Sequence, residues 1–301
     1  MIVVIGEILI DIFQDYQRVG GAPFNFAFHL KKLGFPVRFF TRVGNDQHGR
    51  RIIDLLIKNG FNEADVQVDH RHPTGTVSVD LDEQGIPHFD IRKNVAYDHL
   101  DLNVASVLDA GGAEMIYFGT LLQRTDPGCS QVHRFLSRNT NSAIRFCDIN
   151  MRPPHVNVKA VAGSLHHADL LKVNEAELTD IQHAFDGPAD KGDVTPWLME
   201  TFKISNVALT RGSRGSTFYN RDGQISSPAV AGPPIVDTVG AGDGYAAILA
   251  AGRLRKLPWG ETIRQASRFA AQICGIAGAV PDNENFYDDF QLLMKGDANG
   301  R

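Results

Sequence analysis

One glycine-rich segment carries the residue types best suited to chemistry. It reads Asp237-Thr-Val-Gly240-Ala241-Gly242-Asp243 and leads into small apolar residues that predict a buried helix. A glycine turn entering a helix leaves backbone N–H groups free, and with the helix dipole they form an anion site. The carboxylate of Asp243 is well placed to take a proton from a group that attacks the anion. This combination favours phosphoryl transfer; a tight turn in which Asp243 only complements the helix dipole stays an open alternative.

Two segments in the N-terminal part of the chain could bind a polyol. Gly20 and Gly21 precede Asn25 and would let the backbone approach a ligand, while the amide of Asn25 both donates and accepts hydrogen bonds. Asp11 follows the first predicted strand and could accept hydrogen bonds from two hydroxyls. The alternatives are a helix N-cap for Asn25 and an ordinary strand-end carboxylate for Asp11.

Two segments farther along could approach phosphate groups. Asn174 and Glu177 lie three residues apart where a strand enters a helix, so their oxygens could hold hydrated Mg²⁺ on a nucleotide. The alternative is an N-terminal capping box, which the segment alone favours. A later strand end carries Thr210, Gly212 and Gly215, which could approach phosphates or ribose, although many β-turns have this composition.

Composition limits the classes of function. A chain of 301 residues, 43% hydrophobic and 22% charged, can form one large α/β domain or two smaller ones. A net charge of −5 argues against general nucleic-acid binding, and no apolar run is long enough to span a bilayer. The run 1–6 lacks a basic leader and predicts a strand, not a signal peptide. Cys129, Cys147 and Cys274 lack metal-type spacing, so we expect reduced thiols in a cytoplasmic protein.

Short apolar runs alternate with helical patterns along most of the chain. We expect strands at 2–5, 37–41, 115–118, 144–148, 170–173 and 206–210, and helices at 25–33, 49–58, 128–138, 158–168, 176–184, 196–203, 241–255 and 261–277. This alternation predicts a mostly parallel sheet covered by helices on both faces. The chain lacks the P-loop and dinucleotide fingerprints, so phosphate transfer would need another scaffold.

One region interrupts the alternation. Between 75 and 92, apolar residues such as Val77 and Val79 alternate with polar ones on both sides of a turn at 82–85, which predicts an antiparallel hairpin. Residues 9–19 could add another strand to it. Such a small sheet could be a lid that excludes water from a transfer reaction; the alternative is a simple surface hairpin.

Taken together, these segments resemble the PfkB/ribokinase family of small-molecule kinases over essentially the whole chain. The segment from Asp237 to Asp243 is similar to the family's C-terminal signature, and that from Gly34 to Gly49 to its N-terminal signature. Asn174-Glu-Ala-Glu177 matches the family's Asn-x-x-Glu motif. Features similar to the bacterial fructokinase branch are Gly20-Gly-Ala-Pro23 with Asn25, Pro73-Thr-Gly-Thr76, Val95-Ala-Tyr-Asp98 and Asp148-Ile-Asn150-Met-Arg152-Pro-Pro154.

The resemblance implies a ribokinase-like α/β fold. We expect one kinase domain over 1–301, with a central, mostly parallel sheet, helices on both faces and a small β-sheet lid from about 9–19 and 75–97. The implied ligands are a small-molecule sugar and ATP with Mg²⁺, and many relatives are activated by K⁺. In this family the lid often provides a homodimer interface.

By matching position, the resemblance also assigns site residues. Asp243 would be the general base, and Gly240, Ala241 and Gly242 the anion hole. Sugar would contact Asp11, Gly21, Asn25, Asp148, Asn150 and Arg152. Nucleotide would contact Asn174, Thr210, Gly212, Gly215 and Gly278. Mg²⁺ would be organised by Asn174 and Glu177, and K⁺ by Asp237 and the carbonyl of Val239.

The implied reaction is ATP-dependent phosphorylation of a sugar hydroxyl, and the branch features point to conversion of D-fructose to fructose 6-phosphate. The same residues could serve a 2-keto-3-deoxygluconate kinase, another ketose kinase or a nucleoside kinase, because a few side chains decide hydroxyl recognition. A non-catalytic sugar-binding protein is a further alternative, against which the intact Asp243, Asn174 and Glu177 argue. Phe24 and Phe26 are bulkier than expected beside a sugar, so they either reshape its pocket or pack in the core.

Overall fold

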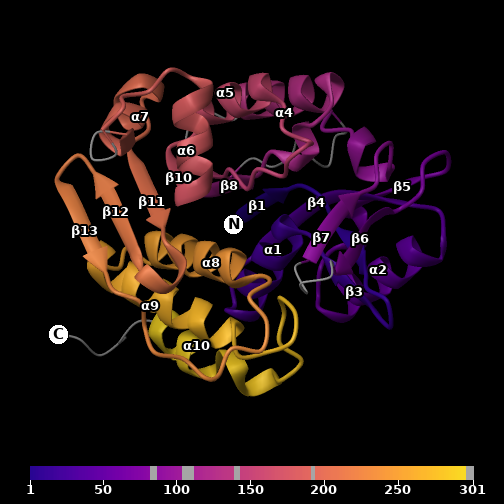
Figure 1. Ribbon diagram of the computed structural model, residues 1–301. Coiled ribbons are helices and arrows are strands. Elements are labelled where there is room, and N and C mark those ends of the chain that lie inside the picture. Colours follow the sequence, from indigo (N-terminus) through magenta and orange to yellow (C-terminus); the bar gives the residue numbers. More distant parts are fainter. Residues whose placement is uncertain (82–86, 104–111, 139–142, 191–193, 296–301) are drawn as a thin grey trace.

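The computed structural model contains two β-sheets of unequal size with helices packed around the larger one (Figure 1). The structure describes residues 1–81, 87–103, 112–138, 143–190 and 194–295. The α/β fold expected from the sequence is confirmed, with a large, mostly parallel sheet and a small second sheet.

The large sheet has the order β13 (Gly223–Ser227), β12 (Ser216–Asn220), β11 (Asn206–Thr210), β10 (Leu170–Asn174), β9 (Ile144–Asp148), β8 (Met115–Phe118), β1 (Ile2–Ile5), β4 (Val37–Gly44) and β5 (Val66–Asp69). Neighbours from β11 to β5 run parallel, while β12 and β13 form an antiparallel hairpin at one edge. The central strand β1 is buried along its whole length, as expected for a parallel strand covered on both faces.

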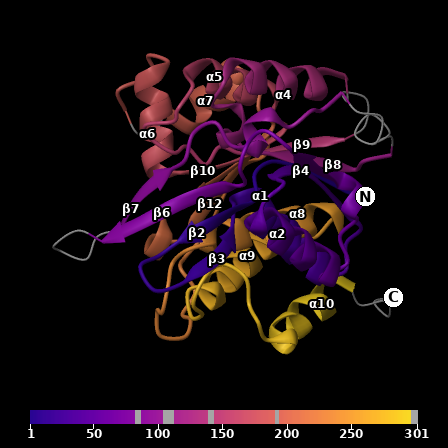
Figure 2. The ribbon, with the colours of Figure 1, turned by 90° about the vertical axis from the view of Figure 1, so that its right-hand side faces the viewer.

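Helices cover both faces of the large sheet. One layer contains α1 (Ala22–Lys32), α2 (Gln47–Lys58), α8 (Ala241–Leu254), α9 (Trp259–Ile273) and α10 (Asp288–Lys295). The other contains α4 (Asp126–Arg138), α5 (Val158–His167), α6 (Glu175–Ala184) and α7 (Val194–Phe202), which lie together at the top of Figures 1 and 2. Because successive strand residues point to opposite faces, Ile2 and Val4 enter the first core, and Val3 and Ile5 the second.

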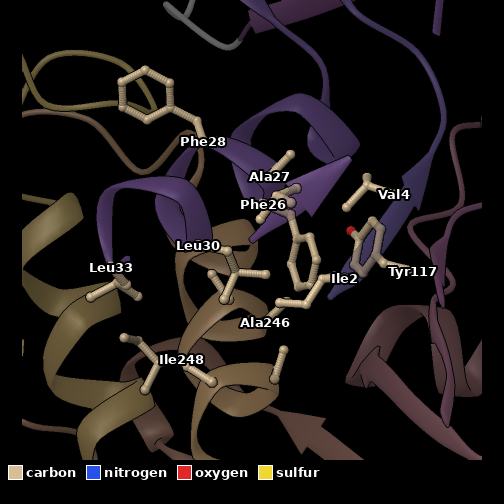
Figure 3. Packing of buried hydrophobic residues seen from close by; sticks show 14 of the residues in the cluster. Ile2, Val4, Phe26, Ala27, Phe28, Leu30, Leu33, Tyr117, Ala246 and Ile248 are labelled. Atoms are coloured by element: carbon tan, nitrogen blue, oxygen red, sulfur yellow. The ribbon is translucent and has the colours of Figure 1, made fainter. Parts of the chain in front are cut away.

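The two bulky phenylalanines near the start of α1, Phe24 and Phe26, pack in the core. Phe24 and Phe26 are both fully buried. The ring of Phe26 stacks on that of Tyr117 with a centroid separation of 3.7 Å, and Figure 3 shows this pair beside Ala246 of α8. Phe24 packs against Phe28 and the strand β4. The structure therefore supports the interpretation that both residues pack in the core and do not reshape a sugar pocket.

The small sheet has the order β3 (Gln17–Gly20), β2 (Leu9–Ile12), β6 (Gly75–Leu81) and β7 (Pro87–Ile91). In Figure 2 the hairpin of β6 and β7 extends away from the large sheet. The expected hairpin is confirmed, although its turn at 82–85 lies outside the described residues. Residues 9–19 contribute two paired strands where one was expected, because the chain turns between Ile12 and Gln17.

Several element boundaries differ from the sequence prediction for visible reasons. Helix α1 begins at Ala22 and not at Asn25, because Gly21 has a φ of 115° just before it and Pro23 fits the first helical turn. Asn25 is thus inside the helix, and its interpretation as an N-cap was wrong. Helix α9 ends at Ile273, four residues early, where the chain enters a glycine-containing loop.

Candidate active site

Residues 237–243, named the catalytic turn for the role that the sequence predicts, lie at the N-terminus of α8. Gly240 precedes the helix in the left-handed region with a φ of 79°, a conformation that favours glycine. The N–H groups of Gly242 and Asp243 have no acceptor among the described residues, and that of Ala241 makes only a long bond of 3.4 Å to Thr238. The turn therefore presents backbone donors at a helix N-terminus, as an anion site requires.

Asp243 is buried beside that turn and is held by α1. Its Oδ2 accepts a hydrogen bond of 2.7 Å from Nδ2 of Asn25, which is 4% exposed. Burial raises the pKa of Asp243 above its usual value, the charge of Asp148 raises it further, and the bond from Asn25 opposes both. A buried carboxylate with a raised pKa, held by one amide, is suited to accept a proton.

A buried ion pair lies behind the catalytic turn. Lys172 on β10 is 6% exposed, and its Nζ lies 2.9 Å and 3.2 Å from the two carboxylate oxygens of Asp148 on β9. Asp148 is fully buried and also accepts a bond of 3.2 Å from the hydroxyl of Tyr117. A Cβ added to Gly242 would lie 3.1 Å from Nζ of Lys172, so this ammonium group adds positive charge next to the turn.

Asp11 and Gly21 lie on the side of the site formed by the small sheet. Burial raises the pKa of Asp11 to about 6, although the positive charge of Arg152 acts in the opposite direction. A Cβ at Gly21 would lie 2.7 Å from the carbonyl oxygen of Glu7, so the close approach of backbone requires glycine there. Arg152 is exposed and Asn150 half-buried with a φ of 42°, both in the segment that follows β9.

The segment at the start of α6 forms a capping box. Oδ1 of Asn174 accepts a bond of 2.9 Å from the N–H of Glu177, and Oε2 of Glu177 accepts one of 2.9 Å from the N–H of Asn174. The other carboxylate oxygen of Glu177 accepts a bond of 3.1 Å from the N–H of Met151. The capping box expected as the alternative is therefore present. It fixes the orientation of both side chains and leaves oxygen lone pairs that can bind a ligand.

A second loop packs against the catalytic turn. Oδ1 of Asp237 accepts a bond of 3.0 Å from the N–H of Val239, and Oδ2 accepts one of 3.0 Å from the N–H of Gly278. A Cβ at Gly240 would lie 2.3 Å from that of Ala279, so the contact leaves no room for a side chain at Gly240. Arg18 of β3 reaches this loop and lies 3.9 Å from Oδ2 of Asp237.

The turn after β11 contains the remaining predicted nucleotide residues. Gly212 has a φ of 55° with open space around its Cα, so backbone is accessible there. Gly215 has a φ of 86°, and a Cβ would lie 2.2 Å from the carbonyl oxygen of Ser227. Close packing against the hairpin of β12 and β13 therefore explains why residue 215 is a glycine. Thr210 ends β11, with its hydroxyl 3.5 Å from the carbonyl of Val173.

Within the described ranges, no group of three or more His, Cys, Asp or Glu side chains is arranged to hold a metal ion. None of the described helices is both long enough and apolar enough to cross a membrane.

The sequence and fold were compared with known proteins. The family model described as pfkB family carbohydrate kinase matches residues 1–285. The chain belongs to the PfkB family of carbohydrate kinases. It is therefore an ATP-dependent sugar kinase, and the resemblance seen in its sequence is confirmed.

Curated PfkB-family relatives are similar over most of their length. The fructokinase of Salmonella typhimurium is 27% identical over 287 residues, covering 90% of this chain and 91% of that protein. The probable fructokinase-5 of Arabidopsis thaliana is 28% identical over 270 residues, covering 81% of this chain and 80% of that protein.

Solved PfkB-type structures share the fold. The sugar kinase PH1459 of Pyrococcus horikoshii aligns with a TM-score of 0.81 and 23% identity, covering 96% of each chain. The fructokinase of Xylella fastidiosa with bound ATP aligns with a TM-score of 0.80 and 22% identity, covering 92% of this chain and 93% of that one.

The structure brings Asp243 and Asn25 into contact, and the charges of Asp11 and Arg152 act on the same region. Sequence reasoning gave no role to Lys172, although a lysine within the apolar run of β10 is a visible signal of a buried ion pair. It also gave none to Glu7, a carboxyl two residues after β1 that is 4% exposed.

Proposed function

We propose that this kinase phosphorylates the 6-hydroxyl of D-fructose with ATP. The observation that carries the proposal is the catalytic turn, where Asp243, held by Asn25, adjoins the free N–H groups at the start of α8. Relatives named fructokinase in both bacteria and plants support fructose as the acceptor.

Each group has a role in the proposed mechanism. Asp11, Gly21 and Asn25 bind the sugar and orient the hydroxyl toward Asp243, with Asn150 and Arg152 beside them. Asp243 accepts the hydroxyl proton as the oxygen attacks the γ-phosphate, and ADP leaves. The N–H groups of residues 240–243 stabilise the charge that develops on the transferring phosphoryl group.

Asp148 is better placed to position the side chain of Lys172 than to contact the sugar. Both of its carboxylate oxygens face Nζ of Lys172, and the residue is fully buried. We assign it the role of holding the Lys172 ammonium group near Gly242, where the positive charge favours the transferring phosphate.

Asn174 and Glu177 would hold Mg²⁺ through water, because both already spend part of their hydrogen-bonding capacity on the capping box. When bound, Mg²⁺ neutralises charge on the phosphate oxygens of ATP. The nucleotide would lie against Asn174, Thr210, Gly212, Gly215 and Gly278. Asp237 and the carbonyl of Val239 are the proposed K⁺ ligands, since the Asp237 carboxylate is fixed by backbone N–H groups and retains lone pairs.

Three further assignments remain proposals. The small sheet is proposed as a lid of one kinase domain, with a homodimer formed through it. A cytoplasmic location is proposed because ATP and free thiols are typical of that compartment.

An ADP-release assay with MgATP and a sugar panel tests the proposed function. The panel contains fructose, 2-keto-3-deoxygluconate, ribose, tagatose, glucose and adenosine. We expect selective turnover of fructose. Preferred turnover of another sugar would overturn the choice of fructose and keep the kinase, whereas sugar binding without any turnover would favour a non-catalytic sugar-binding protein.

A further inference from the structure

Three polar atoms near the base of the small sheet are buried without a hydrogen-bond partner among the described residues. They are Oε2 of Glu7, the hydroxyl oxygen of Tyr97 and Nη1 of Arg124. Glu7 is 4% exposed, Tyr97 is fully buried, and the side chain of Arg124 is 5% exposed. Each unpaired buried polar group costs free energy, so such groups normally find a partner in protein, water or ligand.

The three side chains are neighbours. The guanidinium carbon of Arg124 lies 5.0 Å from the centre of the Tyr97 ring. The charge of Glu7 acts on the pKa of both Tyr97 and Arg124, and the charge of Arg124 acts on that of Glu7. Yet Glu7 and Arg124 form no ion pair within the part of the chain that the structure describes. The unpaired atoms of Glu7 and Arg124 therefore lack a partner that a bridging group would supply.

The free end of Arg124 is held in place. Its Nε and Nη2 donate bonds of 2.7 Å to the two carboxylate oxygens of Asp98, and Nη2 donates a further bond of 2.7 Å to the carbonyl of Arg92. Oδ2 of Asp98 in turn accepts a bond from the N–H of Val95. This two-point contact fixes the plane of the guanidinium group, so Nη1 is presented in a defined direction.

Close backbone packing fixes the Tyr97 ring and the main chain of Glu7. A Cβ at Gly75 would lie 2.4 Å from Cε1 of Tyr97, so the ring rests directly on the backbone of β6. Glu7 follows β1, and its carbonyl oxygen lies 2.7 Å from the Cβ position of Gly21. Because Gly21 is a proposed sugar residue and the charge of Asp243 also acts on Glu7, Glu7 adjoins the proposed sugar site.

Their chemistry selects a particular ligand group. Nη1 of Arg124 can only donate hydrogen bonds, the carboxylate of Glu7 can accept them, and the hydroxyl of Tyr97 can do both. A ligand hydroxyl can accept from Arg124 and donate to Glu7 at once. A ligand carboxylate cannot donate to Glu7 in its ionised form, which predominates above pH 7, and Asp98 already compensates the charge of Arg124.

We propose that Glu7, Tyr97 and Arg124 form a subsite that binds a non-reacting hydroxyl of a neutral sugar and disfavours sugar acids. This inference rests on the proposed function. It states that the sugar acceptor must have a second hydroxyl group, at a position other than the reacting hydroxyl. The three side chains are specificity-determining, whereas Asp243 performs the proton transfer.

The variant Tyr97→Phe gives the sharpest test, measured by calorimetric titration with fructose. The hydroxyl of Tyr97 has no hydrogen-bond partner among the described residues, so its removal should not lower the Tm. We expect a roughly 2- to 10-fold weaker fructose Kd, with the KM for ATP unchanged. Tyr287→Phe is the matched control, because Tyr287 is also buried but bonds His29; its fructose Kd should stay at the wild-type value.

A second variant and modified sugars complete the test. Glu7→Gln keeps the shape of the side chain. In titrations above pH 7, where Glu7 is ionised, it should weaken fructose binding roughly 10-fold or more, as expected for a bond to a charged group. Among fructose analogues that each lack one hydroxyl, the analogue without the bound hydroxyl should bind wild type and Tyr97→Phe equally. Unchanged fructose Kd in both variants would overturn the subsite and mark the cluster as water-filled.

The binding measurement separates this inference from the proposed function. Fructose that binds without turnover, with Kd weakened in both variants, supports the subsite and contradicts the kinase reaction on fructose. Fructose that is phosphorylated with unchanged Kd in both variants contradicts the subsite alone. If wild type binds no neutral sugar of the panel, both are wrong.

Discussion

At the scale of single residues, burial decides how the acidic groups of the site behave. Burial raises the pKa of Asp243, brings that of Asp11 to about 6, and brings that of Glu7 to about 7. The positive charge of Arg152 opposes the shift of all three. Carboxyl groups with raised pKa values are typical of sites that exchange protons or bind through either protonation state.

The raised pKa of Asp11 predicts an acid limb in the sugar kinetics. Asp11 must be ionised to accept hydrogen bonds from sugar hydroxyls, and with a pKa of about 6 it becomes protonated as the pH falls through 6. We therefore expect kcat/KM for fructose to fall up to about tenfold per pH unit below pH 6. A pH profile between 5 and 9 measures this limb.

The variant Asp11→Asn provides the control for that profile. It should have a lower kcat/KM at pH 8 and a weaker dependence on pH between 5 and 7, because its side chain does not titrate. If kcat/KM of Asp11→Asn falls at acid pH with the same midpoint as the wild type, the titrating group is not Asp11.

At the scale of elements, strand register places the charges behind the catalytic turn. Lys172 and Asp148 are direct neighbours in the pairing of β10 with β9. The charge of Asp148 and its hydrogen bond raise the pKa of Lys172 against the opposing effect of burial. Each buried charge of this pair is therefore compensated only when the other residue is present.

Replacing one residue of this pair should lower the free energy of unfolding much more than replacing both. Lys172→Met leaves the fully buried carboxylate of Asp148 without its cation, and we expect unfolding free energy to fall by about 3–5 kcal/mol. The double variant Lys172→Met with Asp148→Leu should recover most of that loss. Urea denaturation measures all three proteins, and a single variant as stable as wild type would contradict the pairing.

Two glycines of the catalytic turn should respond differently to alanine. Gly240→Ala puts a side chain at positive φ and against Ala279, so we expect a loss of about 1–3 kcal/mol in unfolding free energy. Gly242→Ala meets only the end of the flexible Lys172 side chain, so it should fold normally but impair ATP turnover by crowding the anion site. Thermal denaturation and ATP kinetics distinguish the two effects; normal ATP kinetics in Gly242→Ala would count against the anion site.

Elements with a strong period were predictable, and weakly patterned ones were not. The apolar runs of β1 and β8 to β11 and the helical patterns between them all appear as expected. β5 is only four residues long and β13 is mostly exposed, so neither carries a long apolar pattern. These two strands and β12 were missed; β5 and β13 are extended because they pair with a neighbouring strand, and not because of local burial.

At the scale of the whole molecule, the site depends on contacts between distant segments. Asn25 and Asp243 are 218 residues apart, and the fold brings the first helix to the start of α8. Their individual importance was visible in local glycine patterns, and the resemblance to the PfkB family supplied their roles. The sequence did not show their contact, nor that Glu7, Tyr97 and Arg124 converge, because tertiary packing alone sets these distances.

The central claim is that Asp243 is the base of a fructose kinase. The most direct measurement is kcat of Asp243→Asn with fructose and MgATP, alongside the fructose Kd and Tm of the same protein. We predict a kcat lower by about 10²–10⁴-fold, with fructose Kd near the wild-type value. The Tm should not fall, because an asparagine oxygen can still accept the bond from Asn25 and a buried charge is removed. A folded Asp243→Asn protein with wild-type kcat would contradict the account.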